Sequence, residues 1–324
     1  MQRRDMLRGL GAVAAAHTLG AHAQQAFPNR PIRFVVPFAA GGAPDVIARQ
    51  LGIQLGKQLG QSVVVENKLG ANGIVASQDV ARAAPDGHTL LVVTGSHTTN
   101  PSIYRKLPYD TVKDFAPVTQ IFSAPGLVLI VNPKLDVKTP QQFLEAGRAG
   151  KIAYGSPGIG NSLHLPGELL NVLTGTKLLY VPYKGASLAV NGVLSGEVQA
   201  AFVTPTAAMP LVRAGQVRPV AISSAKRINV LPDVPTFAEA SIPGFIYSGA
   251  WMGLVAPGAT PKPILERLSM EIGKALRAPE IYDKLVAEEN IVVASTVDEF
   301  ARFLTEDMAR FADIVKKAGI QPVD

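Results

Sequence analysis

The sequence contains no cysteine among its 324 residues. This absence excludes thiol nucleophiles, disulfide bonds, thiolate metal sites and a lipid-modified N-terminal cysteine. A chain without disulfides must be held together by a large packed core. Its length, about two average domains by the usual prior, permits such a core.

Long apolar runs and clustered positive charge are scarce as well. The apolar run from Leu10 to Leu19 is too short to span a membrane, which needs roughly 20 apolar residues. The formal net charge of +6 is dispersed, without a Lys/Arg block or a basic stripe with interleaved aromatic residues. The composition therefore argues against a nucleic-acid partner and is compatible with a small anionic ligand.

The first residues have the features of an export signal. Arg3, Arg4 and Arg8 precede the apolar run, and Ala21–Ala23 forms an A-x-A cleavage pattern. The adjacent Arg3 and Arg4 also fit a twin-arginine signal, although a general secretory signal with two chance arginines explains them equally well. Both routes export the protein, so we predict a signal peptide over residues 1–23 and exclude it from the fold.

Short apolar runs alternate with helical patterns in the remaining chain, which predicts an α/β fold with mainly parallel sheets. The expected strands are 32–37, 62–67, 89–95, 126–133, 151–156, 177–183, 198–203, 217–224 and 249–257. The expected helices are 44–60, 73–83, 139–147 with Thr139 as N-cap, one after the stretch 153–162, 186–195, 206–214, 261–276 and 296–318. Residues 225–247 form a proline-rich loop.

The simplest organisation is two lobes joined by two crossings, near residues 124 and 248. Lobe 1 would comprise residues 24–124 and 248–324, and lobe 2 would comprise residues 125–247. In open parallel sheets, ligands bind beyond the carboxyl ends of the strands. The loops between strands and helices are therefore where we expect a binding site.

The stretch PFAAGGAPDVIAR (37–49) is the first such loop. Gly41 and Gly42 free the backbone, Pro44 suits the first helical position, and Asp45 suits the first turn. Uncapped N–H groups and the helix dipole would form an anion site without a cationic side chain, whereas a tight turn without a ligand explains the residues equally well. The stretch lacks the lysine of a P-loop, which argues against a triphosphate.

The stretch AYGSPGIGNSLHLPGE (153–168) is the second such loop. A dinucleotide fingerprint fails here, because Leu163 stands where the third glycine belongs and no acidic residue follows at the end of the next strand. What remains is a flexible loop with Ser156, Asn161 and Ser162 at a helix start, which suits a carboxylate. We favour an anion site over a structural turn because a similar loop lies in the other lobe.

Metal and catalytic motifs are weak. His164 and Glu168 have a spacing that a metal site could use on a helix, but two ligands do not make a site, and His88 and His97 fall in no motif. No G-x-S-x-G elbow is present, although a triad could still be assembled from distant residues. We predict no metal, no cofactor and no catalytic residue. Tyr183 in PYKG either lines a pocket or is a buried residue at a strand end.

A series of motifs resembles one known family. The stretches are PFAAGGAPDVIAR, VVVENKLGANG, PDGHTLLV, LPYDTVKDFAPVT, YGSPGIGNSLHLPGELL, VPYKG, LPDVPTFAEA and WMGLVAPGATP, in this order. Together they look like the Bug family, the exported solute receptors of tripartite tricarboxylate transporters. The resemblance covers essentially all of the chain after the signal peptide.

The resemblance implies a fold like the type II periplasmic binding proteins, with two α/β lobes joined by two hinge crossings and a ligand cleft between them. It implies a periplasmic, monomeric receptor for a small carboxylate, with a membrane permease or sensor as its partner. One carboxylate would bind at the first loop and a second at the glycine-rich loop. The candidate ligand-binding residues are Phe38, Ala39, Ala40, Gly41, Gly42, Asp45, Ser96, Ser156, Gly158, Gly160, Asn161, Ser162, His164, Tyr183, Gly185, Val203 and Thr204.

Two positions depart from the family pattern. Pro166 stands where a small residue is usual, which leaves the start of that helix open. Val203, Thr204 and Pro205 stand where a polar or acidic residue is common, which argues against a ligand amino group and favours a di- or tricarboxylate or an aromatic acid. The rival hypothesis is an exported enzyme that uses a binding-protein fold to act on a carboxylated substrate, and it requires an acid, base or nucleophile in the cleft.

Overall fold

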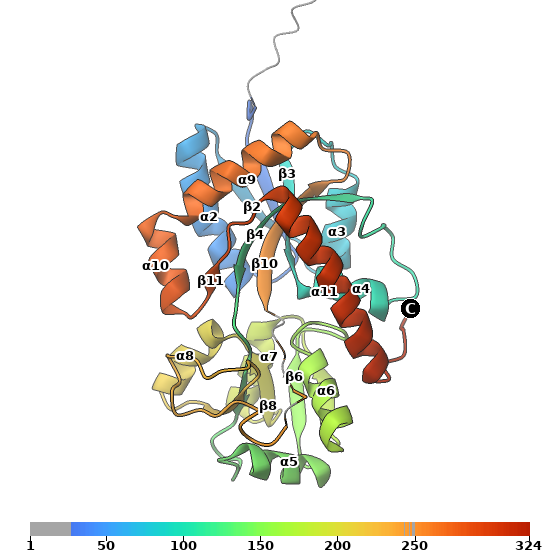
Figure 1. The fold of residues 1–324 in the computed structure, drawn as a ribbon, viewed down its shortest axis with the longest axis vertical. Helices are drawn as coiled ribbons and strands as arrows, with labels where there is room; N and C mark the ends of the chain where they lie inside the picture. Colours follow the sequence, from blue (N-terminus) through green and yellow to red (C-terminus); the bar gives the residue numbers. More distant parts are fainter. Residues whose placement is uncertain (1–26, 243, 246, 248–249) are drawn as a thin grey trace, which may run out of the picture.

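The computed structural model describes residues 27–242, 244–245, 247 and 250–324. The predicted signal peptide, residues 1–23, lies outside the described residues, and so do residues 248 and 249 at the second predicted crossing. The described chain forms two α/β lobes, each built on one mixed sheet (Figure 1).

Lobe 1 is built on a six-stranded sheet with the order β11-β4-β10-β3-β1-β2. Its strands are β1 (Ile32–Val36), β2 (Val63–Asn67), β3 (Thr89–Thr94), β4 (Phe115–Ser123), β10 (Trp251–Pro257) and β11 (Ile291–Val292). Strand β1 pairs in parallel with β2 and β3, whereas β10 runs antiparallel to β3 and β4. The carboxyl ends of β1, β2 and β3 therefore share one edge of the sheet.

Helices cover both faces of this sheet. They are α2 (Ala43–Leu59), the 3-10 turn η1 (Ala71–Gly73), α3 (Ile74–Ala81), α4 (Gly95–Ile103), α9 (Lys262–Leu276), α10 (Pro279–Ala287) and α11 (Val297–Lys317). Helices α2, α9 and α10 bury apolar side chains against one face, and α3 and α11 pack on the other. In α2 these side chains are Ile47, Leu51 and Leu55, at the predicted spacing of four.

Lobe 2 is built on a five-stranded sheet with the order β7-β6-β8-β5-β9. Its strands are β5 (Val128–Val131), β6 (Ala153–Ser156), β7 (Leu179–Pro182), β8 (Ala200–Val203) and β9 (Arg218–Ile222). Strand β6 pairs in parallel with β7 and β8, and β5 runs antiparallel to β8 and β9. The carboxyl ends of β6, β7 and β8 therefore also share one edge.

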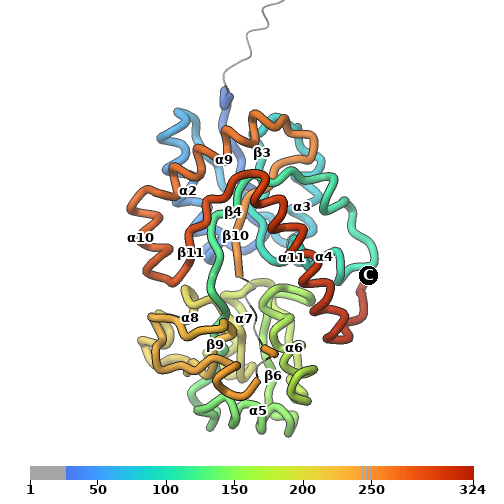
Figure 2. The backbone as a smooth tube through the Cα atoms, in the orientation of Figure 1, coloured from blue at the N-terminus to red at the C-terminus, as the bar shows by residue number. Residues whose placement is uncertain are grey.

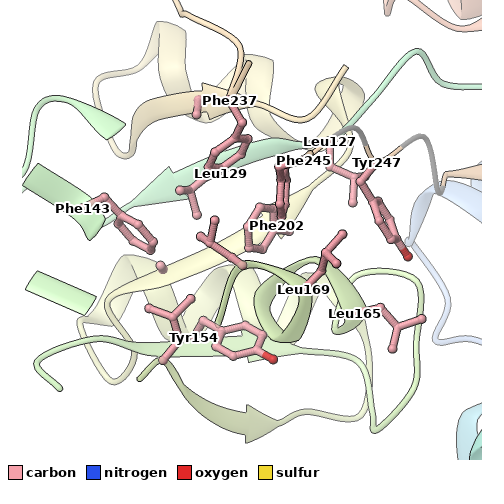
Figure 3. Packing of buried hydrophobic residues seen from close by; sticks show 14 of the residues in the cluster. Leu127, Leu129, Phe143, Tyr154, Leu165, Leu169, Phe202, Phe237, Phe245 and Tyr247 are labelled. Carbon is pink, nitrogen blue, oxygen red and sulfur yellow. The ribbon is translucent and has the colours of Figure 1, made fainter. Parts of the chain in front are cut away.

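The helices of lobe 2 are α5 (Pro140–Arg148), α6 (Leu165–Thr174), α7 (Ala186–Ser195) and α8 (Pro205–Arg213). Strand β5 alternates between two cores, because Leu129 packs with α5 and α6 while Val128 packs with α7 and α8. Figure 3 shows the first of these cores, to which Leu129, Tyr154, Phe202 and Phe245 belong.

The sequence prediction was right for the strongly periodic elements and wrong for several others. The helix at 186–195 is confirmed, and Thr139 caps α5 with a capping box. Helix α4 was missed because its sequence, GSHTTNPSI, has no apolar period. Strand β4 was missed because Pro117, Thr119 and Gln120 interrupt its apolar residues. Strand β11 and helix α10 were missed as well. The sheets are mixed rather than mainly parallel, because β10 enters lobe 1 antiparallel to its neighbours.

The chain crosses between the lobes from β4 to β5 and again from β9 to β10 (Figure 2). A third connection comes from α11, which begins on lobe 1 and reaches lobe 2 with its C-terminal half. Phe311, Ile314 and Val315 belong to the same buried cluster as Leu169 of α6. The C-terminal helix thus packs on both lobes.

Candidate functional site

The loops predicted to bind a ligand follow the carboxyl ends of parallel strands in both lobes. In lobe 1 they follow β1 and β3, and in lobe 2 they follow β6, β7 and β8. Because parallel pairing brings these ends to one edge, the predicted residues of each lobe gather there.

The loop between β1 and α2 contains residues 38–42. Ala40 and Gly41 are exposed, and the other three residues are half-buried. Gly41 has a φ of +82°, which glycine adopts without strain. Gly42 is the N-cap of α2, and no side chain caps this helix start. The first N–H groups of α2 are therefore suited to a negatively charged group.

Asp45 lies behind this loop and is 2 % exposed. Its carboxylate accepts hydrogen bonds from the Gly41 N–H (2.9 Å), Arg49 Nε (3.0 Å) and Asn67 Nδ2 (2.9 Å). Burial opposes ionisation, but these hydrogen bonds outweigh burial and hold the pKa of the carboxyl below its ordinary value. Asn67 also donates to the carbonyl of Phe38 (3.0 Å). The Asp45 carboxylate thus supports the loop from inside.

Ser96, in the first turn of α4, lies next to the first loop. It is 4 % exposed, and its Oγ lies 3.3 Å from Thr94 Oγ1. A Cβ added to Gly73 would lie 3.2 Å from Pro37 Cβ and 3.9 Å from Ser96 Oγ. Gly73 at the end of η1 therefore lies beside both the start of the first loop and the start of α4.

His97 follows Ser96 and lines a small cavity with Pro37, Ser77 and Asn100. Its ring is edge-on to Phe115, and neither ring nitrogen has a hydrogen-bond partner among the described residues. Burial lowers the pKa of His97 to about 4. The side chain is therefore neutral near pH 7.

The polar side chains of the glycine-rich loop between β6 and α6 are buried, although Ile159 at its tip is exposed. Ser156 is 0 % exposed, Asn161 is 3 % and Ser162 is 6 %. Ser156 Oγ donates to the carbonyl of Gly158 (3.4 Å), and Asn161 Oδ1 accepts from the Leu163 N–H (2.9 Å). These bonds within the loop hold its hydroxyl and amide groups in place.

His164 supports this loop and is 4 % exposed. The Gly160 N–H donates to His164 Nδ1 (3.1 Å), and Nε2 lies 3.4 Å from Glu168 Oε1. Because Nδ1 accepts a hydrogen bond, the neutral tautomer with its hydrogen on Nε2 fits both contacts. Tyr154 stacks on the ring at 6.0 Å, and Tyr180 lies edge-on at 4.2 Å. Both nitrogens of His164 are thus engaged within lobe 2.

The same cluster sets the charge of Glu168. Tyr154 Oη donates to Glu168 Oε1 (2.7 Å) and also lies within hydrogen-bond distance of the His164 carbonyl (3.2 Å). Burial opposes ionisation of Glu168, but hydrogen bonds from His164 and Tyr154 outweigh it and lower the pKa of the carboxyl. Burial raises the pKa of Tyr180 to about 12. The carboxylate is therefore ionised and the phenol is neutral near pH 7.

Pro166 does not interrupt the helix that follows. Helix α6 begins at Leu165, and Pro166 lies in its first turn, where a missing N–H costs no intrahelical hydrogen bond. The departure from the family pattern is therefore accommodated in the first turn.

Tyr183 packs within lobe 2. A Cβ added to Gly155 would lie 2.8 Å from its ring, and a Cβ added to Gly192 would lie 2.3 Å from its hydroxyl oxygen. Tyr183 therefore packs against Gly155 and Gly192, and its contact with a ligand stays a prediction.

The remaining predicted residues lie at helix starts of lobe 2. Gly185 is the N-cap of α7, and Thr204 is the N-cap of α8, where its side chain accepts from the Ala207 N–H (3.3 Å). Val203 is 2 % exposed and belongs to the core beneath α7 and α8. Contact of these residues with a ligand stays a prediction.

The two lobes meet at the glycine-rich loop. Asn161 Nδ2 donates to Asn72 Oδ1 of η1 (3.1 Å), and Asn72 Nδ2 donates to the carbonyl of Ile159 (3.4 Å). A Cβ added to Gly160 would lie 2.2 Å from Ile103 of α4. Asn72 precedes Gly73, whose Cβ position touches Ser96 and the start of the first loop. This contact between the lobes therefore brings predicted binding residues of both lobes close to one another.

Sequence reasoning missed Asn72 and Ile103. The stretch GANG contributed only to the family resemblance, although an asparagine followed by a glycine signals a turn with left-handed backbone. Ile103 lies at the end of the missed helix α4, and no motif or spacing in the sequence pointed to it.

The described residues offer neither a metal site nor a membrane-spanning helix. There, no group of three or more His, Asp or Glu side chains could hold a metal ion. Nor is any helix in that part of the chain long and apolar enough to cross a bilayer.

Comparison with known proteins gives consistent matches. Residues 47–320 match the model of the "Tripartite tricarboxylate transporter family receptor". The chain is 34 % identical to protein BugT of Bordetella pertussis over 297 residues, which cover 90 % of each chain. A solved structure of an R. palustris protein with adipate has a TM-score of 0.86 at 31 % identity, and covers 92 % of this chain and 100 % of that one. MatC of Rhodopseudomonas palustris with bound malate has a TM-score of 0.84 at 34 % identity, with 89 % and 100 % covered.

Proposed function

The chain belongs to the family of tripartite tricarboxylate transporter receptors, and from this premise we propose that it captures a small dicarboxylate, tricarboxylate or aromatic acid between its lobes. Members of this family are solute-binding receptors rather than enzymes, so the chain is a binding protein. The lobes would be residues 24–124 with 248–324 and residues 125–247, and the crossings between them would act as hinges.

One observation carries the proposal. Each lobe has one lysine-free loop that leads into a helix start without a side-chain cap. The two lobes contact each other beside these loops, where Asn161 of the glycine-rich loop bonds Asn72 of η1. The first N–H groups of α2 have no side-chain cap and favour a carboxylate. At the start of α6 the N–H groups of Leu165 and Gly167 already donate to the Asn161 and His164 carbonyls, so the second carboxylate would be held by polar groups of the glycine-rich loop itself. One such place in each lobe suits a ligand with two acidic ends. The similar proteins crystallised with malate and adipate hold ligands of this kind.

The second lobe supports a ligand without an amino group. Val203 is buried, Thr204 uses its side chain to cap α8, and Pro205 follows in the first helical turn. An ammonium group in the closed cleft would need a carboxylate partner to offset its desolvation. The two carboxylates near the predicted loops already have partners, since Asp45 pairs with Arg49 and Glu168 contacts His164.

The closed, ligand-bound form would deliver its ligand to a membrane permease or report to a sensor, as a monomer in the periplasm. Binding of the ligand at both lobes would stabilise the closed form relative to an open one. The permease or sensor would therefore distinguish the ligand-bound protein by its closed conformation. Light scattering on the mature protein with and without ligand checks the monomer, and a dimer would contradict that part of the proposal.

The test is a binding survey on protein stripped of ligand by unfolding and refolding. Calorimetric titrations with malate, adipate, a tricarboxylate and benzoate should give saturable binding for at least one acid, and titrations with amino acids should give none. No heat and no thermal shift for any acid would contradict the proposal. Recovery of a chemically altered ligand after incubation would favour the enzyme alternative instead.

A further inference from the structure

Asn72 has an unusual backbone. It lies in η1 with a φ of +51°, between Ala71 at +45° and Gly73 at +88°. Left-handed backbone is disfavoured for residues with a Cβ, although asparagine tolerates it better than most. The turn therefore holds an amide side chain at a position where a glycine would be less strained, which points to a role for the side chain itself.

The Asn72 amide joins three elements. Its Nδ2 donates to Asn100 Oδ1 of α4 (2.8 Å) and to the carbonyl of Ile159 (3.4 Å), and its Oδ1 accepts from Asn161 Nδ2 (3.1 Å). Asn100 in turn donates from Nδ2 to the Asn72 carbonyl (3.2 Å). Asn100 and Asn161 are 1 % and 3 % exposed. The result is a bridge of three amides from lobe 1 to the glycine-rich loop of lobe 2.

The Asn161 end of this bridge is set by the loop that carries it. Asn161 Oδ1 is bonded to the Leu163 N–H, which leaves Nδ2 directed at Asn72. The loop also lies so close to lobe 1 that Gly158 faces Asn72 and Gly160 faces Ile103 without space for a side chain at position 160. The contact between lobes therefore depends on the conformation of the same loop that is proposed to hold a carboxylate.

We infer that Asn72 is the positioning residue that couples ligand capture to lobe closure, an inference that rests on the proposed function above. A carboxylate bound at the glycine-rich loop orders residues 158–161, and the ordered loop presents Asn161 and the Ile159 carbonyl to Asn72. In an open form these polar groups are solvated, and in the closed form they pair with one another. Asn72 thereby slows ligand release without touching the ligand.

The experiment compares Asn72→Gly with Ala71→Gly. Both substitutions relieve a left-handed residue in the same turn, but only the first removes the bridging amide, so Ala71→Gly is the matched control. With malate and adipate as probes in stopped-flow binding, Asn72→Gly should raise the dissociation rate about tenfold, since loss of the bridge costs about 1.4 kcal/mol. Its association rate, and both rates of Ala71→Gly, should match the wild type.

A double-mutant cycle tests the partner. Asn161→Asp keeps an oxygen for the Leu163 N–H but can no longer donate to Asn72. If the two amides act together, Asn161→Asp should have a smaller effect in the Asn72→Gly background than in the wild type. Strictly additive effects would overturn the inference.

Lobe closure can be measured independently of affinity. The chain has no cysteine, so two spin labels can be attached at introduced cysteines without labelling any other site. Suitable exposed positions are Lys57→Cys on α2 and Glu145→Cys on α5. Asn72→Gly should shift the distance distribution between lobes toward longer distances, and an unchanged distribution would overturn the inference. If the wild type binds no carboxylate, the proposed function is wrong. The distance distribution between the two spin labels then still shows whether Asn72 holds the lobes together.

Discussion

The loop after β1 and the loop after β6 have equivalent places in the two lobes, yet different chemistry holds them. The first is supported by a buried carboxylate, Asp45, which bonds Gly41, Arg49 and Asn67. The second is supported by the His164 side chain, which lies between the Gly160 N–H and Glu168, and by close packing against lobe 1. The first loop is therefore held by a buried carboxylate within its own lobe, whereas the second is held by His164 and also depends on the partner lobe.

The glycines of the two loops should separate them most strongly. Gly160→Ala places a Cβ 2.2 Å from Ile103 at a φ of +69°, whereas Gly41→Ala at +82° meets nothing within 4 Å. Overpacking plus a left-handed residue should cost Gly160→Ala about 4 kcal/mol, or roughly a 1,000-fold loss of affinity. Gly41→Ala should lose about tenfold from backbone strain alone. Calorimetry with malate or adipate measures both, and equal losses would show that the loops do not differ in this way.

Acid should destabilise the protein through the buried His97. His97 in lobe 1 has a pKa of about 4, whereas the unfolded chain binds this proton near the ordinary value of about 6.5. Protons therefore favour the unfolded chain, and stability should fall by about 3 kcal/mol as the pH drops from 6.5 to 4. His97→Leu should remove this part of the decline. Urea unfolding across this range measures the difference, and parallel curves for the two proteins would contradict the prediction.

His164→Leu should destabilise lobe 2 by about 2 kcal/mol, because the Gly160 N–H and Glu168 each lose a buried partner. His164→Gln is the control, since its amide oxygen can accept from the Gly160 N–H. Ligand affinity should follow stability in this pair, with a loss for leucine and little change for glutamine. Denaturant unfolding and titration check both, and two equally weak variants would argue against a positioning role.

Asp45→Asn should have the smallest effect, about 1.5 kcal/mol. The amide oxygen still accepts from the Gly41 N–H, but the NH2 group that replaces the other oxygen no longer accepts from Asn67 and Arg49. The lowered pKa of Asp45 contributes stability above its unfolded pKa, and this contribution is lost as the pH falls through the folded value. The variant should therefore unfold in acid with a shallower slope than the wild type. A steeper slope in acid would count against the assigned charge state.

Local patterns predicted the elements whose signal is periodic. The stripe of Ile47, Leu51 and Leu55 predicted α2, and Thr139 as N-cap before Pro140 predicted α5. Helix α4 and strand β4 escaped because tertiary contacts, rather than an apolar period, stabilise them. The assignment of α11 to lobe 1 alone would likewise miss Phe311, which packs against lobe 2.

The sequence by itself determined the family, the strongly periodic helices and most of the strands, the two lysine-free glycine loops and the exclusion of thiol chemistry. Those features depend on residue types and short spacings, which are local. Only the tertiary structure decided why position 160 has no space for a side chain, and that Asn72 and Asn161, 89 residues apart, form one bridge. Such contacts depend on which strands pair and how the lobes meet. Short sequence patterns do not predict contacts between residues that lie far apart in the chain.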